Sequence, residues 1–188
     1  MIVEDNENLR ELIRHLLESQ FRIITAEEGQ EAIQLLTEQS VDLVVSDIMM
    51  EGMDGLALCQ WIKNTFEYCH IPVILLTAKH GDSSRIEGYN SGADGYITKP
   101  FSFQVLQARI DNLLKQQDLR SSRYRNQVVI EVEKLDYTSM DEQFLRQAIA
   151  CVNAHIADSS FSRTDFVREM NTSRTVLTEK LKSLTGLT

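Results

Sequence analysis

Residues 41–55 read VDLVVSDIMMEGMDG, and this segment indicates the class of fold. A run of apolar residues ends in Asp47, and a loop that contains two glycines follows it. Nearly continuous apolar runs of this length are typical of parallel strands that are buried on both faces. In open α/β sheets the chemistry lies at the carboxyl ends of such strands, so Asp47 is a candidate functional residue.

Polar side chains also end three further apolar runs in the first 100 residues. They are Glu4 and Asp5 after the first run, Thr77 after the second and Lys99 after the third. Because the carboxyl ends of parallel strands meet at one edge of a sheet, we expect these groups to lie beside Asp47. Carboxylates crowded there repel one another, by about 4 kcal/mol per pair at about 4 Å and an effective dielectric of about 20. A hard, oxygen-ligated cation such as Mg²⁺ would relieve the repulsion, and Lys99 supplies a second positive charge.

The composition is ordinary for a globular protein, since the 188 residues are 43% hydrophobic and 25% charged. No run approaches the roughly 18 apolar residues that a membrane span requires, and no signal-peptide pattern opens the chain. We therefore expect a cytoplasmic protein. Three cysteines occur, at positions 59, 69 and 151, and their spacing indicates neither a zinc site nor a disulfide framework.

Charge is divided unevenly along the chain, whose formal net charge is -9. Residues 1–115 hold nine basic and 18 acidic side chains, whereas residues 116–188 hold ten of each. The last segment, residues 162–188, holds five basic and three acidic side chains. An asymmetry of this kind indicates two modules with different functions.

Apolar residues alternate between strand-like and helix-like spacing through the first module. The strands that this pattern predicts are 1–3, 21–26, 41–46, 71–76 and 96–98. The helices that it predicts are 9–17, 32–36, 56–64, 84–89 and 105–114. Strands and helices that alternate in units of this size predict an α/β fold with a five-stranded, parallel, doubly wound sheet.

The second module is predicted to be small and all-helical. Residues 116–125 are polar and contain three arginines, which indicates a linker or a helical extension, and residues 128–132 suit a short strand. Helical spacing begins again at Asp141, and two short helices follow that Ser162 and Ser173 would cap. Two short helices around a tight turn form a helix-turn-helix, whose second helix can enter a DNA major groove. A helical hairpin used only for packing is the alternative.

The first module resembles a response-regulator receiver domain. The acid pair Glu4-Asp5, Asp47, Thr77 and Lys99-Pro100 stand at the ends of the predicted strands in the order and spacing of that family. The resemblance covers residues 1–118 and implies a flavodoxin-like fold. It also implies a signalling domain rather than an enzyme, with at most self-phosphorylation from small phosphodonors and self-dephosphorylation.

The resemblance implies a role for each of these residues. Asp47 would accept a phosphoryl group from a histidine kinase. Asp5, Asp47 and the backbone carbonyl of Met49 would bind Mg²⁺, and Glu4 would help through water. Thr77 and Lys99 would hold the phosphoryl oxygens, Tyr96 would change rotamer, and the Lys99–Pro100 peptide would be cis.

Two consequences of phosphorylation follow from the same resemblance. The face formed by the fourth helix, the fifth strand and the fifth helix would change, because Tyr96 and Lys99 both lie on the fifth strand. We expect a phosphorylation-dependent homodimer to form there, through residues such as Asp94 and Arg109.

Residues 141–188, which follow a linker at 119–140, resemble the first half of an AraC-type DNA-binding domain. The residues that carry this likeness are Phe161-Ser162, Ser173-Arg174 and the segment LKSLTGL at 181–187. It implies that Thr175, Thr178 and Glu179 face the DNA groove and that Arg174 and Lys182 approach phosphates. With one helix-turn-helix instead of two, and only a small excess of basic residues, DNA binding should be weak and salt-sensitive.

The order of modules fits a free transcriptional regulator and also resembles the C-terminal end of hybrid sensors that contain a histidine kinase. The short first strand, residues 1–3, favours the second origin and suggests that the native strand begins earlier in a longer protein.

Two other functional classes fit a sheet of this type. A Mg²⁺-dependent phosphatase with an aspartate nucleophile needs a second acid two residues after Asp47, where this chain has Met49. A flavodoxin-like flavin-binding protein needs a phosphate loop rich in hydroxyls and glycines, whereas Glu4 and Asp5 would repel a phosphate monoester. Both classes rank below the receiver.

Overall fold

Five short strands form one parallel sheet in a computed structural model that describes residues 1–78, 91–125, 139–158 and 160–186. The strand order is β2-β1-β3-β4-β5, and every neighbouring pair is parallel. The strands are β1 (Ile2–Val3), β2 (Thr25–Ala26), β3 (Val44–Asp47), β4 (Val73–Thr77) and β5 (Gly95–Thr98). The predicted five-stranded parallel sheet is confirmed.

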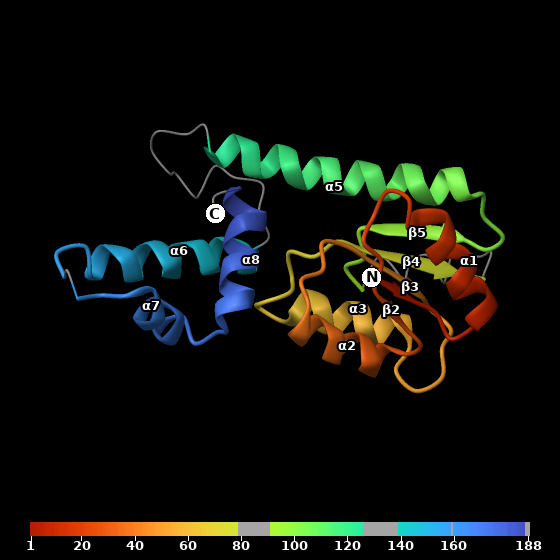
Figure 1. Cartoon of the computed structure of the whole chain (residues 1–188), viewed down its shortest axis with the longest axis horizontal. Helices are drawn as coiled ribbons and strands as arrows, with labels where there is room; N and C mark the ends of the chain where they lie inside the picture. The colour runs from red at the N-terminus through yellow and green to blue at the C-terminus, as the bar shows by residue number, and fades with distance from the viewer. Residues whose placement is uncertain (79–90, 126–138, 159, 187–188) are drawn as a thin grey trace. The chain divides into compact units, whose positions relative to one another are not determined.

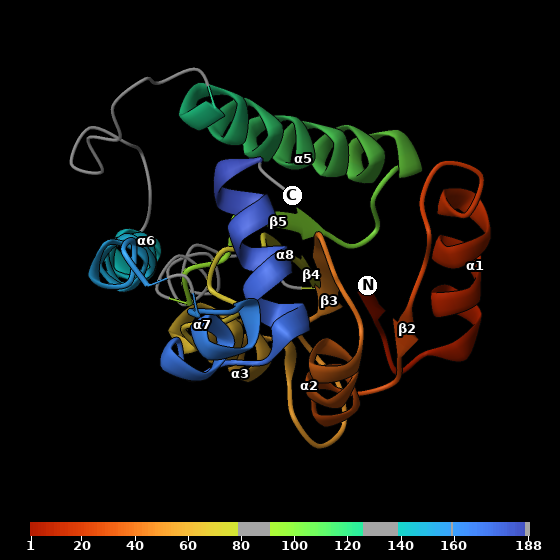
Figure 2. The same cartoon turned by 60° about the vertical axis from the view of Figure 1, so that its left-hand side comes forward.

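Helices cover both faces of this sheet (Figures 1 and 2). They are α1 (Glu7–Leu17), α2 (Gly29–Glu38), α3 (Gly55–Asn64) and α5 (Phe103–Arg125). Helices α1 and α5 pack on one face, where their apolar residues join those of the strands in a single core. The buried members of that core are Ile2, Ile13, Leu17, Leu43, Val45, Ile74, Leu76, Ile97, Leu106, Ile110 and Leu113. Helices α2 and α3 lie on the opposite face (Figure 2).

Two elements differ in length from their predictions. Strand β2 comprises only two of the predicted residues 21–26, because its neighbour β1 offers only Ile2 and Val3 for pairing. Helix α5 continues to Arg125 through the polar residues 116–125, which contain no glycine or proline to end it. Helical extension is therefore the alternative that the structure shows, and residues 119–125 of the predicted linker are helical.

The described chain divides into two compact units. Unit 1 comprises Met1–Asn64 and Ile71–Leu114 and contains the sheet. Unit 2 comprises Thr65–His70 and Lys115–Thr188. Its helices after α5 are α6 (Ser139–Ala154), α7 (Arg163–Glu169) and α8 (Arg174–Thr185). The predicted domain limits of 118 and 141 remain predictions.

The helices of unit 2 form a small core of their own. Its buried residues are Phe144, Leu145, Leu177 and Leu184. The predicted caps are present, because Ser162 accepts a hydrogen bond from the amide of Asp165 and Ser173 accepts one from Val176. The additional helices are consistent with a helical second domain, and a turn at Asn171, with φ of 49°, separates α7 from α8.

Two predictions fall outside the described residues, namely the helix at 84–89 and the strand at 128–132. Cys59, Cys69 and Cys151 are all free thiols, as the spacing predicts. Within the described ranges, no helix combines the length and the hydrophobicity needed to cross a bilayer.

Candidate functional site

Asp47 is the last residue of β3, and its side chain is fixed at the carboxyl edge of the sheet. The residue is only 7% exposed. Its Oδ1 accepts a hydrogen bond from the backbone N–H of Ile48 at 2.8 Å, and its Oδ2 accepts one from Lys99 Nζ at 2.8 Å. The hydroxyl of the buried Ser46 donates to the backbone carbonyl of Asp47 at 2.8 Å. These contacts hold the carboxylate in one orientation.

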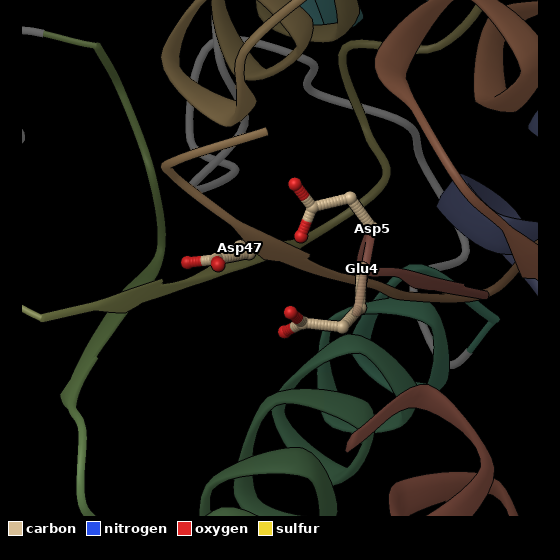
Figure 3. A group of neighbouring side chains, drawn as sticks. All are labelled: Glu4, Asp5 and Asp47. Carbon is tan, nitrogen blue, oxygen red and sulfur yellow. The ribbon is translucent and has the colours of Figure 1, made fainter. Parts of the chain in front are cut away.

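Glu4 and Asp5 follow β1, the neighbour of β3, so their carboxylates lie beside Asp47 (Figure 3). One carboxylate oxygen from each of the three residues lies within 4.8 Å of the others. Glu4 is buried, whereas Asp5 is exposed. A set of hard oxygen donors at this separation suits Mg²⁺, which takes one or two carboxylates and keeps several waters. The exposed position of Asp5 leaves room for those waters.

Lys99 follows β5 and provides the positive charge of the site. Its ammonium donates to Glu4 Oε2 and to Asp47 Oδ2, each at 2.8 Å. Burial works to lower the pKa of Lys99, but the hydrogen bonds to the two carboxylates outweigh it, and the pKa lies above its usual value. Lys99 is therefore a fixed cation, and its peptide bond to Pro100 is cis, as predicted.

Glu4 is a buried acid whose surroundings disfavour its ionisation. Burial raises its pKa, the hydrogen bond and the charge of Lys99 lower it, and the charge of Asp47 raises it again; the net direction is upward. The folded state therefore binds this proton more tightly than the unfolded chain does. Stability from this group is present below the usual glutamate pKa and is lost as the pH rises through the folded pKa.

We expect Glu4→Gln to become increasingly stabilising, relative to wild type, as the pH rises above the usual glutamate pKa. Glutamine fills the same volume and carries no charge beside Asp47, so the cost of ionising residue 4 disappears. Thermal unfolding of both proteins over a series of pH values measures the effect. Exposed Glu7→Gln is the matched control and should show no such trend. A Glu4→Gln difference that shrinks with rising pH would contradict this account.

The loop after β3 approaches the sheet closely at Gly55. A Cβ atom there would lie 2.0 Å from the carbonyl oxygen of Asp47, so only glycine fits. The Gly55 amide donates to the carbonyl of Ile48 at 3.1 Å, which closes the loop. Met49 lies within this loop and is 60% exposed, and it supplies no acid two residues after Asp47. The use of its carbonyl as a metal ligand remains a prediction.

An open pocket gives solvent access to these groups. Its lining residues are Glu4, Asp5, Asn6, Asn8, Leu9, Leu12, Asp47 and Lys99. Thr77 ends β4, directly beside β3, and Tyr96 lies on β5 opposite Leu75. Both are partly exposed, and their predicted switching roles remain predictions.

Arg10 is a site residue that the sequence pattern did not indicate. It is 8% exposed in α1, and its guanidinium donates to the carbonyl of Glu4 at 2.7 Å and to Glu27 at 2.8 Å. It therefore fixes the backbone of the acid pair. An arginine among the polar residues of an amphipathic helix is expected to be exposed. Nothing in the spacing of Arg10 distinguishes it from the exposed Arg14.

The predicted DNA-contacting residues all lie on α8. Arg174, Thr175 and Lys182 are exposed, whereas Thr178 and Glu179 are partly exposed. The Thr178 hydroxyl donates to the carbonyl of Arg174 at 2.8 Å and accepts from Arg163 at 3.1 Å. Lys180 lies between Arg174 and Lys182 in the sequence, but it is fully buried and pairs with Asp141 of α6 at 3.3 Å. Of the three basic residues on α8, Arg174 and Lys182 are therefore accessible to a phosphate, whereas Lys180 belongs to the core.

Comparison with known proteins agrees with this geometry. The family model of the response regulator receiver domain matches residues 1–111. The chain is 36% identical, over all 188 residues, to histidine kinase P4 of Formosa agariphila, and 32% identical over 162 residues to the heme response regulator HssR of Staphylococcus haemolyticus. It spans only 14% of the first protein and 67% of the second.

A solved structure shows the same fold. The receiver domain of a signal transduction histidine kinase from Syntrophus aciditrophicus is 34% identical, with a TM-score of 0.58. The match covers 69% of this chain and 94% of that one. The sheet, the acid cluster and these likenesses define a receiver of a two-component signalling system. The chain belongs to the response regulator receiver domain family.

Proposed function

We propose that Asp47 accepts a phosphoryl group and that Asp5, Asp47 and Glu4 form the Mg²⁺ site that this transfer requires. The observation that carries the proposal is the contact of one lysine with two acids, because Lys99 binds both Glu4 and Asp47 at 2.8 Å. Perturbed and paired groups gathered in an open pocket are typical of functional sites. The phosphodonor would be a histidine kinase, in the same chain or in another.

The transfer would form a bond between phosphorus and a carboxylate oxygen of Asp47 and break the bond to the donor, whose leaving group takes the electron pair. Mg²⁺ would offset the repulsion between the carboxylates and the incoming phosphoryl oxygens. Lys99 is already in place to exchange its contact with Asp47 for one with a phosphoryl oxygen. Ile48 N–H keeps Oδ1 oriented, so the chain needs little rearrangement before transfer.

The added phosphoryl group would then change the carboxyl edge of the sheet. Its oxygens are strong acceptors and would draw in the hydroxyl of Thr77, which lies on the adjacent strand. Tyr96 would move into the space that Thr77 leaves. A local change in charge is thereby converted into a change at β5.

The simplest test is incubation with Mg²⁺ and acetyl phosphate, followed by the intact mass. Stable addition of one phosphoryl group supports the receiver function. Rapid turnover of phosphate esters without an adduct would instead support an aspartate-nucleophile phosphatase.

We further propose that unit 2 is part of an AraC-type transcriptional output and that the whole protein is a hybrid sensor. Support for the output comes from the capped helices α7 and α8, with exposed Arg174 and Lys182 on the second. Support for the hybrid comes from the likeness to a histidine kinase, which extends over the whole chain rather than over the receiver alone.

We expect this chain to bind duplex DNA weakly. In a plot of log affinity against log salt concentration, whose slope is negative, Arg174→Ala should make the slope less steep by about one. The reason is the loss of one phosphate contact with its released counterion. Arg168→Ala is the control, since Arg168 is exposed on α7 but already pairs with Asp165 at 2.7 Å. Fluorescence anisotropy over a salt series measures both slopes. Equal slopes for Arg174→Ala and wild type would mean that Arg174 does not contact a DNA phosphate.

We also propose that phosphorylation promotes a homodimer at the face that includes β5 and α5. Asp94 and Arg109 are at present engaged within the chain, because Arg109 donates to the Asp94 carbonyl and the Asp94 carboxylate pairs with Lys63 at 2.8 Å. Analytical ultracentrifugation should show a larger mass after phosphorylation, and Arg109→Ala should reduce that increase. Identical masses before and after phosphorylation would exclude this dimer.

A further inference from the structure

The hydroxyl of Tyr96 has a defined partner that the family resemblance does not assign. Tyr96 Oη and Ser91 Oγ share a hydrogen bond of 2.9 Å. Ser91 is only 3% exposed and lies in the turn that leads into β5. A buried hydroxyl in a turn, facing a tyrosine on the following strand, restricts where that ring can lie.

The turn that carries Ser91 is itself held at both ends. Cys59, fully buried on α3, donates its thiol to the Ser91 carbonyl at 3.4 Å. The Asp94 amide donates to the carbonyl of Val73, and the Asp94 carboxylate accepts from the Val73 amide, so β4 fixes the end of the turn. Lys63 of α3 adds an ion pair with Asp94. Ser91 therefore offers its hydroxyl from a fixed frame.

This hydrogen bond belongs to the arrangement in which Lys99 pairs with the Asp47 carboxylate. If Tyr96 moves toward Thr77 when Asp47 is modified, the ring must leave Ser91. A bond between two neutral hydroxyls in a partly buried site contributes about 1 kcal/mol net. That amount corresponds to a shift of about fivefold in an equilibrium between two positions of the ring.

We propose that Ser91 is a positioning residue that holds Tyr96 in its unswitched position and so sets the threshold of the receiver. The inference rests on the proposed phosphoacceptor function and adds a residue to it. Removing the hydroxyl should favour the switched position, because its bond to Tyr96 exists only in the unswitched position, whereas its contact with the Cys59 sulfur at 3.8 Å does not involve the ring. Ligands that favour the switched state then bind more tightly.

The test uses beryllofluoride with Mg²⁺ as the phosphoryl mimic, and the ¹⁹F resonance of bound fluoride as the readout on the whole chain. Ser91→Ala should bind the mimic about fivefold more tightly than wild type. Ser91→Thr, which keeps the hydroxyl, should stay close to wild type. Tyr96→Phe removes the same bond from the other side and should also bind more tightly, so the prediction does not depend on one variant folding well.

A double-mutant cycle separates positioning from general packing. In the Tyr96→Phe background, Ser91→Ala should have no further effect, since the bond is already absent. If Ser91→Ala and Tyr96→Phe act additively, or if neither changes the affinity, the inference is overturned while the phosphoacceptor function stands. If wild type itself binds no beryllofluoride, the proposed function is overturned and this inference with it.

Discussion

Asp47→Asn is expected to take up no phosphoryl group from acetyl phosphate and Mg²⁺ under conditions in which wild type gains one. The amide lacks the charge and nucleophilicity of the carboxylate, and it would be a weaker ligand at the proposed Mg²⁺ site. The fold should survive, because asparagine has the same shape and its single amide oxygen can still accept from one of the two donors, the Ile48 amide or Lys99. The loss should be complete within the sensitivity of intact-mass measurement.

Asp42→Asn is the matched control for this substitution. Asp42 is an exposed aspartate that precedes β3, so the same chemical change is made near the opposite end of the strand. Asp42→Asn should gain one phosphoryl group as wild type does. An adduct on Asp47→Asn of the same extent as on wild type would move the acceptor to another residue.

Lys99→Met is expected to slow phosphoryl uptake by a factor on the order of 10². Methionine fills the space of the lysine stem but leaves Glu4 and Asp47 without the ammonium that both contact. The incoming phosphoryl oxygens then meet two buried carboxylates with no fixed cation opposite them.

The time course of the intact mass with acetyl phosphate gives the rate for this variant, and circular dichroism checks its fold. Lys115→Met is the control, since Lys115 is an exposed lysine on α5. It should react at the wild-type rate. A Lys99→Met rate within about threefold of wild type would mean that Lys99 is a structural partner of Glu4 and takes no part in transfer.

Much of the first unit could be predicted from the sequence because its strands are buried on both faces. The apolar run that ends in Asp47 has no other stable place than the interior of a parallel sheet. Once the sheet is parallel, the ends of its strands share one edge, and Glu4, Asp47 and Lys99 must come together there. The contact of Lys99 with Asp47 follows from that placement.

Other features depend on long-range packing that local patterns do not encode. Arg10 is buried only because the carbonyl of Glu4 and the carboxylate of Glu27 meet it from two other segments. The hydrogen bond between Ser91 and Tyr96 depends on the path of a turn that α3 and β4 hold in place. In α8, the sequence pattern predicts that Lys180 is exposed like the other basic residues of the helix. It lies instead in the core of unit 2, where it pairs with Asp141.

The most direct measurement is to locate the phosphoryl group itself. Protein treated with acetyl phosphate and Mg²⁺ is reduced with borohydride, which converts a phosphorylated aspartate into homoserine, and the peptides are then sequenced by tandem mass spectrometry. The account predicts homoserine at position 47 alone. Homoserine at another aspartate, with residue 47 unchanged, would contradict it.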